Sequence, residues 1–278
     1  MEFTQINRIV KLTEYFQPPW RLSLWVLLLC FFSFGKEVKE KQYYIHFGVT
    51  SQSGKEFYNA NGKIVPLNYY TQNGILLSGH YWFKKWGKVV WKLPIYYHEF
   101  RGGETEFGFG DGDLEVAFPI LKKGLLWEVG IGVQLPMGEE NTPRYLNLGE
   151  GVMGYQLSSS LQKSFFKKVF LEGRGRYQFR SELTDRTNYK ASISYKLKNT
   201  IRIGTTVRGQ RMVSAPLANR INPYLGFGEG VESDKQGILV LYPSGSVMIH
   251  FQIMGHYWGE ARNIMDDTNL EMGMGIKF

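Results

Sequence analysis

The sequence has little cysteine and, after its first part, few long apolar runs. Cys30 is the only cysteine, which excludes an intramolecular disulfide framework and a cysteine-based metal site. From Lys36 onward no uncharged apolar run reaches the length of about 18 residues that a membrane-spanning helix needs. A Gly-x-Ser-x-Gly elbow and a phosphate-binding loop are also missing, so the sequence offers no nucleophile or nucleotide motif.

Glycine and aromatic residues are abundant instead. The chain of 278 residues contains 32 glycines and 15% aromatic residues, and 43% of it is hydrophobic. This composition excludes a disordered chain and favours many strands joined by tight turns. The formal net charge of +8 comes from basic residues that are dispersed along the chain rather than clustered. We therefore expect no nucleic-acid partner.

An export signal is predicted at the N-terminus. Residues 22 to 34 form an uncharged apolar run that is too short to span a bilayer but suits the core of a signal peptide. Arg8, Lys11 and Arg21 supply the basic flank, and the small residues Ser33 and Gly35 predict cleavage after Gly35. We expect residues 1–35 to be the signal peptide and 36–278 the folded domain. An alternative interpretation makes Cys30 a lipidated residue, and the true translation start could also lie further into the chain.

The remaining chain alternates between apolar and polar residues with a period of two. Between 169 and 182 the odd positions include Leu171 and Phe179, whereas the even positions include Arg174 and Arg176. The same alternation recurs in segments of about 10 residues, which is typical of strands with one apolar and one polar face. Twelve strands are expected, near 42–50, 74–84, 88–99, 111–120, 124–136, 152–164, 168–181, 187–197, 200–212, 236–243, 246–258 and 268–278.

The connections between these strands alternate between short and long. Short turns such as 165–167 follow the even strands, and longer connections such as 51–73 and 137–151 follow the odd ones. An even number of strands with short turns on one rim is typical of bacterial outer-membrane barrels. Lipid offers no partner for a free sheet edge, so such a sheet must close. The sequence thus predicts an all-β fold, a closed antiparallel transmembrane β-barrel of about 12 strands preceded by a cleaved signal peptide.

The C-terminal strand strengthens this interpretation. Every second residue from Leu270 to the terminal Phe278 is apolar. Such an ending resembles the signal that the outer-membrane assembly machinery reads. We expect Met274, Ile276 and Phe278 to form this assembly signal.

Three glycine-rich motifs suggest a family. Gly108-Phe109-Gly110-Asp111, Leu135-Pro136-Met137-Gly138 and Leu148-Gly149-Glu150-Gly151 resemble the outer-membrane β-barrel family associated with the meta-pathway of phenol degradation. The resemblance covers roughly residues 75 to 278 and implies a transporter-like barrel for hydrophobic or aromatic compounds. From the residues themselves we interpret 108–113 as a hairpin connection with positive φ angles rather than a calcium loop.

Polar and ionisable side chains on the inward phase are the candidate functional residues. The predicted lumen-lining residues are His46, His80, Trp82, Lys92, His98, Asp113, Glu115, Glu128, Glu172, Arg174, Arg176, Arg180, Lys190, Arg202, Arg208, His250, His256 and Trp258. The basic residues on consecutive strands could create a field across the lumen that orients anionic solutes. Alternatively, the acidic residues neutralise the arginines in a structural ladder.

All five histidines fall on the inward phase of neighbouring strands. A metal site or proton relay is conceivable there, but we favour satisfied wall residues and expect no metal and no cofactor. His46 and His80 are expected to make transport depend on pH between about 5 and 8. None of these histidines is followed two residues on by serine, as in outer-membrane phospholipases, so we expect no enzyme activity.

The predicted function is passive uptake of small molecules through an outer-membrane channel, with hydrophobic or aromatic compounds as solutes. One alternative is a basic-lumen channel for acidic sugars or other anions, and another is a structural or adhesive barrel that acts through its long loops. The pore should be narrow or gated, because about 12 strands lie between barrels filled by side chains and open porins. The expected location is the bacterial outer membrane after export through the inner membrane. Expected partners are its lipid and lipopolysaccharide, the assembly machinery and a small-molecule solute.

Overall fold

The computed structural model describes residues 43–83, 87–100, 105–121, 124–138, 148–198, 201–213, 221–222, 227–228, 232–243, 247–256 and 260–277. The chain divides into two compact units, Met1–Val38 and Lys39–Phe278, and all of these residues belong to the second. The expected signal peptide, Cys30, Trp258 and Phe278 lie outside the described residues. Among the residues described, no helix is long and apolar enough to cross a membrane.

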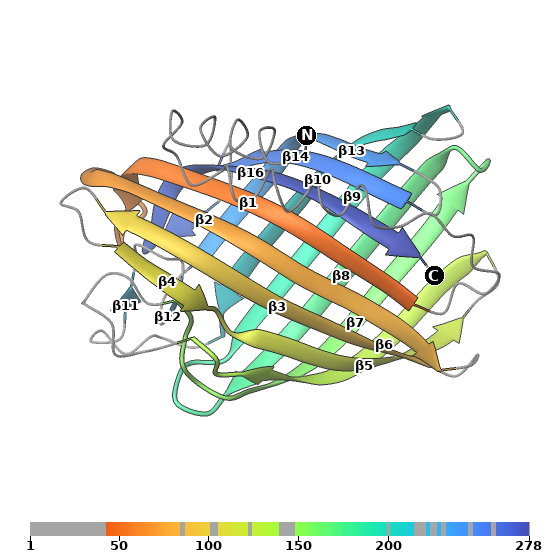
Figure 1. Ribbon diagram of the computed structural model, residues 1–278, viewed down its shortest axis with the longest axis horizontal. Coiled ribbons are helices and arrows are strands. Elements are labelled where there is room, and N and C mark those ends of the chain that lie inside the picture. The colour runs from red at the N-terminus through yellow and green to blue at the C-terminus, as the bar shows by residue number, and fades with distance from the viewer. Residues whose placement is uncertain are drawn as a thin grey trace, which may run out of the picture. The chain divides into compact units, whose positions relative to one another are not determined.

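Antiparallel strands make up the second unit (Figure 1). The strands are β1 (Tyr43–Tyr58), β2 (Ile64–Phe83), β3 (Gly87–Phe100), β4 (Thr105–Phe109), β5 (Gly112–Leu121), β6 (Leu125–Leu135), β7 (Gly154–Phe165), β8 (Val169–Arg180), β9 (Arg186–Lys198), β10 (Ile201–Met212), β11 (Ile221–Asn222), β12 (Phe227–Gly228), β13 (Glu232–Pro243), β14 (Val247–Gly255), β15 (Ala261–Arg262) and β16 (Ile264–Lys277).

The main sheet closes on itself. Its 14 described strands include the short β4 and β15, which pair at the side of β3 and at the end of β13, so 12 strands form the wall. β1 pairs with β16 over most of its length, and β10 pairs with β13, which joins the two ends of the sheet. The closed 12-stranded antiparallel barrel predicted from the sequence is therefore confirmed.

The barrel is apolar outside and polar inside. On β6, Ile131 points outward and is 59% exposed, whereas on β8 the inward Gln178 is only 1% exposed. Most of the fully or nearly buried side chains are glutamine, charged residues, histidine, serine or threonine, and the exposed side chains include many leucines, isoleucines and aromatic residues. This polarity is the reverse of that of a water-soluble protein and matches a barrel surrounded by lipid.

The first hairpin is longer than the sequence predicts. Residues 51–73 were expected to form a long connection, but β1 continues to Tyr58 and β2 begins at Ile64. The turn between them is held by Asn59, whose side-chain oxygen accepts hydrogen bonds from the amides of Asn61 and Lys63 at 2.9 and 3.0 Å. The prediction missed this extension because residues 51–73 do not alternate between apolar and polar residues.

Candidate functional site: the barrel cavity

The barrel encloses a cavity of about 550 Å³. Its wall combines polar residues such as Gln72 and Asn188 with a larger number of cationic than anionic side chains. The cationic residues that line it are Lys92, Arg174, Arg176, Arg186, Lys190, Arg208 and Lys235, and the acidic ones are Asp111, Asp113, Glu150 and Glu271. Six of the predicted inward residues therefore meet at this cavity: Lys92, Asp113, Arg174, Arg176, Lys190 and Arg208.

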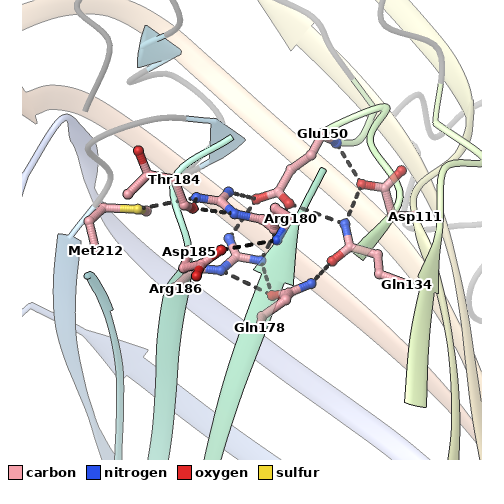
Figure 2. A network of polar contacts seen from close by, with 9 residues as sticks. All are labelled: Asp111, Gln134, Glu150, Gln178, Arg180, Thr184, Asp185, Arg186 and Met212. Carbon is pink, nitrogen blue, oxygen red and sulfur yellow. Dashed lines mark hydrogen bonds and ion pairs between the residues drawn. The ribbon is translucent and has the colours of Figure 1, made fainter. Parts of the chain in front are cut away.

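A buried ionic cluster bounds part of this cavity (Figure 2). Glu150 lies between β6 and β7, yet its carboxylate oxygen Oε1 accepts hydrogen bonds from Arg180 at 3.0 Å and from Arg186 at 2.6 Å. The side chains of Glu150 and Arg180 are 1% and 0% exposed. Gln178 accepts a further hydrogen bond from Arg186 at 2.8 Å. The cluster thus fixes the segment that contains Glu150 against β8 and β9.

Asp111 fixes the other side of the same segment. Its carboxylate accepts hydrogen bonds from the backbone amide of Glu150 at 2.6 Å, from the Gln134 side chain at 2.8 Å and from the Gly138 amide at 3.3 Å. Asp111 lies outside the strands, and its burial raises the pKa of its carboxyl group. The three glycine-rich motifs noted in the sequence, around 108–111, 135–138 and 148–151, therefore meet at one carboxylate.

The glycines of these motifs are explained by close packing. A Cβ atom at Gly149 would lie 2.4 Å from Asp111 Oδ1, and one at Gly110 would lie 2.9 Å from the carbonyl oxygen of Leu148. The expectation that 108–113 forms a hairpin connection with positive φ angles is wrong. β4 pairs with β3 and not with β5, and Gly108, Gly110 and Gly112 do not have positive φ angles.

Two of the predicted arginines are neutralised by acidic residues from a distant strand. Arg174 contacts Glu115 at 2.8 Å, and Arg176 contacts Asp113 at 3.2 Å. These pairs join β8 to β5 across β6 and β7, and a Cβ atom at Gly130 on β6 would lie 2.7 Å from the Glu115 carboxylate. The small residue gives the long side chains room to lie along the wall. These contacts favour the structural ladder over a free field for this pair of arginines.

The other predicted charged residues are distributed around the barrel. Glu128 accepts a hydrogen bond from Lys88 at 2.8 Å. Glu172 lies 3.5 Å from Lys190. Arg202 stacks on the ring of Phe170 at 4.0 Å and lines a second cavity of about 380 Å³. Glu128 and Arg202 are absent from the lining of the larger cavity.

The histidines form separate contacts rather than one cluster. His46 Nε2 lies 3.2 Å from His250 Nδ1, and His250 Nε2 lies 3.0 Å from Glu271. His80 instead stacks on Tyr44 at 5.0 Å and meets Trp82 edge to face at 6.3 Å.

The remaining two histidines lie apart from this pair. His98 is 0% exposed and packs against Tyr70 and Tyr96. His256, just beyond β14, lies 3.6 Å from Asp267. The histidine whose ring contacts that of His46 is therefore His250 and not His80.

Sequence reasoning missed several residues that the structure brings together. Glu150 and Asp111 were noted only as parts of glycine-rich turns, and Arg186 was placed just before its strand. Gln134 and Gln178 were noticed only as polar positions of alternating segments. The available signal was an acidic residue between two glycines, Gly149-Glu150-Gly151, because small neighbours let the backbone of this segment pack closely against other parts of the barrel.

The barrel is similar in fold to solved outer-membrane channels. No protein-family model matches this sequence, and no curated protein matches it. The COG4313 outer membrane channel from Pseudomonas putida F1 superposes with a TM-score of 0.66 at 14% identity, covering 88% of this chain and 100% of that one. The KdgM porin gives a TM-score of 0.50 at 9% identity, covering 84% of this chain and 99% of that one. At such identities the likeness concerns the fold, so this chain has the fold of outer-membrane β-barrel channels.

Proposed function

We propose that the protein is a channel for passive uptake of small molecules across the bacterial outer membrane. In this proposal the protein reaches the outer membrane after its export through the inner membrane. The observation that carries this proposal is the closed barrel with an apolar exterior and a polar cavity of about 550 Å³. A cavity of this size holds a small molecule rather than a macromolecule. In this proposal the predicted inward residues line the permeation path, and Glu150 with its arginines narrows it.

The residues that line the two cavities bear on the class of solute. Hydrophobic or aromatic compounds require an apolar path, and the candidates for it on the inward phase are Tyr44, Trp82, Tyr96, Phe170 and Met254. Of these, Tyr96 lines the larger cavity and Phe170 lines the second one. Aromatic solutes therefore have Tyr96 as a contact, and the cationic wall supports the alternative of anionic solutes.

Recording in planar lipid bilayers tests the channel. The purified protein should produce discrete current steps of low conductance, because the ionic cluster at Glu150 occupies part of the barrel. Addition of an aromatic solute should reduce or interrupt the current while the solute occupies the cavity. A protein that inserts in folded form but conducts no ions would favour the structural or adhesive barrel that acts through its loops.

We propose further that Met274, Ile276 and Phe278 carry the assembly signal. Met274 and Ile276 lie on β16, the strand that closes the barrel against β1. Deletion of Phe278 should lower the amount of protein in the outer membrane, measured by cell fractionation, because the assembly machinery reads the end of this strand. Normal levels of the truncated chain would contradict the proposal.

Lipopolysaccharide remains a proposed contact of the basic residues at the rim.

A further inference from the structure

Four cationic residues lie in one row across four adjacent strands. Arg174 on β8 is the register partner of Lys190 on β9, Lys190 is the partner of Arg208 on β10, and Arg208 is the partner of Lys235 on β13. All four line the cavity of about 550 Å³. We call this row the basic belt.

A row of like charges is costly in a sheet. Directly paired residues have Cβ atoms about 4.5 to 5.5 Å apart, and like charges at that distance are destabilising. The next row differs on three of these strands, since Asn188, Gln210 and Ser233 follow one another in register on β9, β10 and β13. Its position on β8 is Arg176. On β9, β10 and β13 the cations are therefore concentrated in one row, and the next row on these three strands carries uncharged polar residues.

The two ends of the basic belt are neutralised. Arg174 hydrogen-bonds to Glu115 at 2.8 Å, and Lys235 hydrogen-bonds to Asp267 at 2.7 Å. The side chains of Glu115 and Asp267 are 5% and 0% exposed. These close pairs with buried carboxylates satisfy the outer members of the belt.

The two central members are less well matched. Lys190 lies 3.5 Å from Glu172, and Arg208 lies 3.8 Å from Glu271. Their side chains are 38% and 41% exposed, and neither donates a hydrogen bond to another side chain in the described part of the chain. Glu271 is instead hydrogen-bonded to His250 at 3.0 Å. The donors of Lys190 and Arg208 are therefore available to a molecule in the cavity.

A third cation adds to this region. Lys92 on β3 lines the same cavity, and no hydrogen bond or ion pair joins it to another described residue. Its register partner on β5 is Asp113, and Lys92 lies within electrostatic range of Asp113, Arg208 and Glu271. Tyr96, two inward positions further along β3, also lines the cavity and presents an aromatic ring.

We propose that the centre of the basic belt, Lys190 and Arg208, binds the carboxylate of a small organic anion during its passage. This inference rests on the proposed channel function and specifies its solute class. Arginine and lysine donors suit a carboxylate, and the protein wall around the cavity strengthens such charged hydrogen bonds relative to bulk water. Lys92 contributes a further cation, beside Asp113, from a third strand, and Tyr96 offers a surface for the apolar part of the solute.

The test uses the purified full-length barrel in planar bilayers. Benzoate is the anionic probe, and benzyl alcohol is its uncharged counterpart of similar size. Benzoate should block the ionic current of the parent protein at lower concentration than benzyl alcohol does. The double variant Lys190→Gln/Arg208→Gln should weaken block by benzoate by about tenfold or more, as expected for the loss of charged hydrogen bonds. It should also lower the preference for chloride over potassium in a salt gradient.

Matched variants separate charge in the belt from charge elsewhere. Arg202→Gln removes a cation from the same strand, β10, but outside the larger cavity, and should leave block by benzoate unchanged. The charge-preserving pair Lys190→Arg/Arg208→Lys should retain block. Lys190→Gln alone, at a half-exposed position, serves as the test if the double variant does not assemble, and a several-fold loss of block is then expected.

The outcomes distinguish the inference from the proposed function. A parent protein that carries no current would overturn the channel proposal itself. A current that benzoate blocks equally in the parent and the double variant would overturn the role of the basic belt and leave the channel standing. Equal block by benzyl alcohol and benzoate would do the same, because the site would then not recognise charge.

Discussion

At the scale of single residues, the interior of the barrel is held by carboxylates shared between several donors. Glu150 accepts from two guanidinium groups, and Asp111 accepts from two backbone amides and a glutamine. A charged group can remain buried only if such partners replace the water it has lost. These residues were not predictable as a site, because the alternating pattern shows which side chains point inward but not which of them meet.

Replacing Glu150 tests the strength of this cluster. Glu150→Gln leaves the buried Arg180 and Arg186 without their carboxylate, and removal of one partner of a buried ion pair costs about 3 to 5 kcal/mol. We expect a loss of that size in the free energy of unfolding, measured by denaturant titration in lipid vesicles. Glu172→Gln is the control, since its pair with Lys190 is more than one-third exposed and is worth about 1 kcal/mol or less. Equal effects of the two changes would contradict the role of Glu150.

His256 makes stability depend on pH. The residue lies just beyond β14, and burial first, then the nearby charge of Lys235, lower its pKa to about 3. Asp266, Asp267 and Tyr58 also face the ring. An unfolded chain protonates this histidine below about 6.5, whereas the folded barrel does not. The contribution of the neutral His256 to the free energy of unfolding is therefore complete above pH 6.5 and is lost progressively as the pH falls toward 3.

The variant His256→Gln cannot take up this proton. Between pH 6.5 and pH 4 its free energy of unfolding should fall less steeply than that of the parent, because the unfolded variant gains no proton at this position. Denaturant titrations at a series of pH values provide the measurement. Parallel curves for the two proteins would show that His256 is not kept neutral by the fold.

At the scale of strands, the sequence predicts the wall of the barrel but not its rim. The strand expected near 168–181 matches β8, because apolar residues must face lipid along its length. Near the turn that joins β1 to β2 this constraint disappears, since water on both sides of the sheet removes the need for an apolar residue at every second position. The alternation then fades although the hydrogen-bonded ladder continues. The extension of this hairpin therefore follows from pairing between strands, which no single segment reveals.

Glycines on the inner face mark places where side chains from other strands cross. A Cβ atom at Gly273 on β16 would lie 2.3 Å from His46 Nε2 and 2.4 Å from His250 Cε1. Gly273→Ala should therefore push the two imidazole rings apart and lower the free energy of unfolding by about 1 to 3 kcal/mol, the usual cost of overpacking.

Gly173 provides the matched control for this change. It lies on β8, and a Cβ atom added there meets nothing within 4 Å. Gly173→Ala should be neutral or stabilise the barrel by about 0.5 to 1 kcal/mol, because alanine loses less conformational freedom than glycine in a strand. Denaturant titration of both variants provides the comparison. A Gly273→Ala barrel as stable as the parent would mean that the histidine rings can move aside without cost.

At the scale of the whole barrel, closure of the sheet and an inversion of polarity define the molecule. Pairing of β1 with β16 and of β10 with β13 leaves the wall without a free edge, which a lipid environment requires. The fold could be predicted from sequence because this requirement leaves a regular signal in every strand. The contents of the lumen could not, because inward side chains of different lengths can pair across several strands, as Arg174 and Glu115 do.

The inversion of polarity gives a prediction about membrane insertion. Ile131 lies near the middle of β6, pairs with Val116 and Leu157 on the neighbouring strands and is 59% exposed. If this face contacts hydrocarbon, Ile131→Arg places a charge near the centre of the bilayer and should lower the free energy of unfolding by about 2 to 4 kcal/mol in lipid vesicles. Ser53→Arg is the control, because Ser53 is exposed on the extended part of β1, where lipid is not expected. That variant should unfold at the same denaturant concentration as the parent. Equal stability of all three proteins would mean that Ile131 faces water. The apolar outer surface around Ile131 would then not be in contact with lipid.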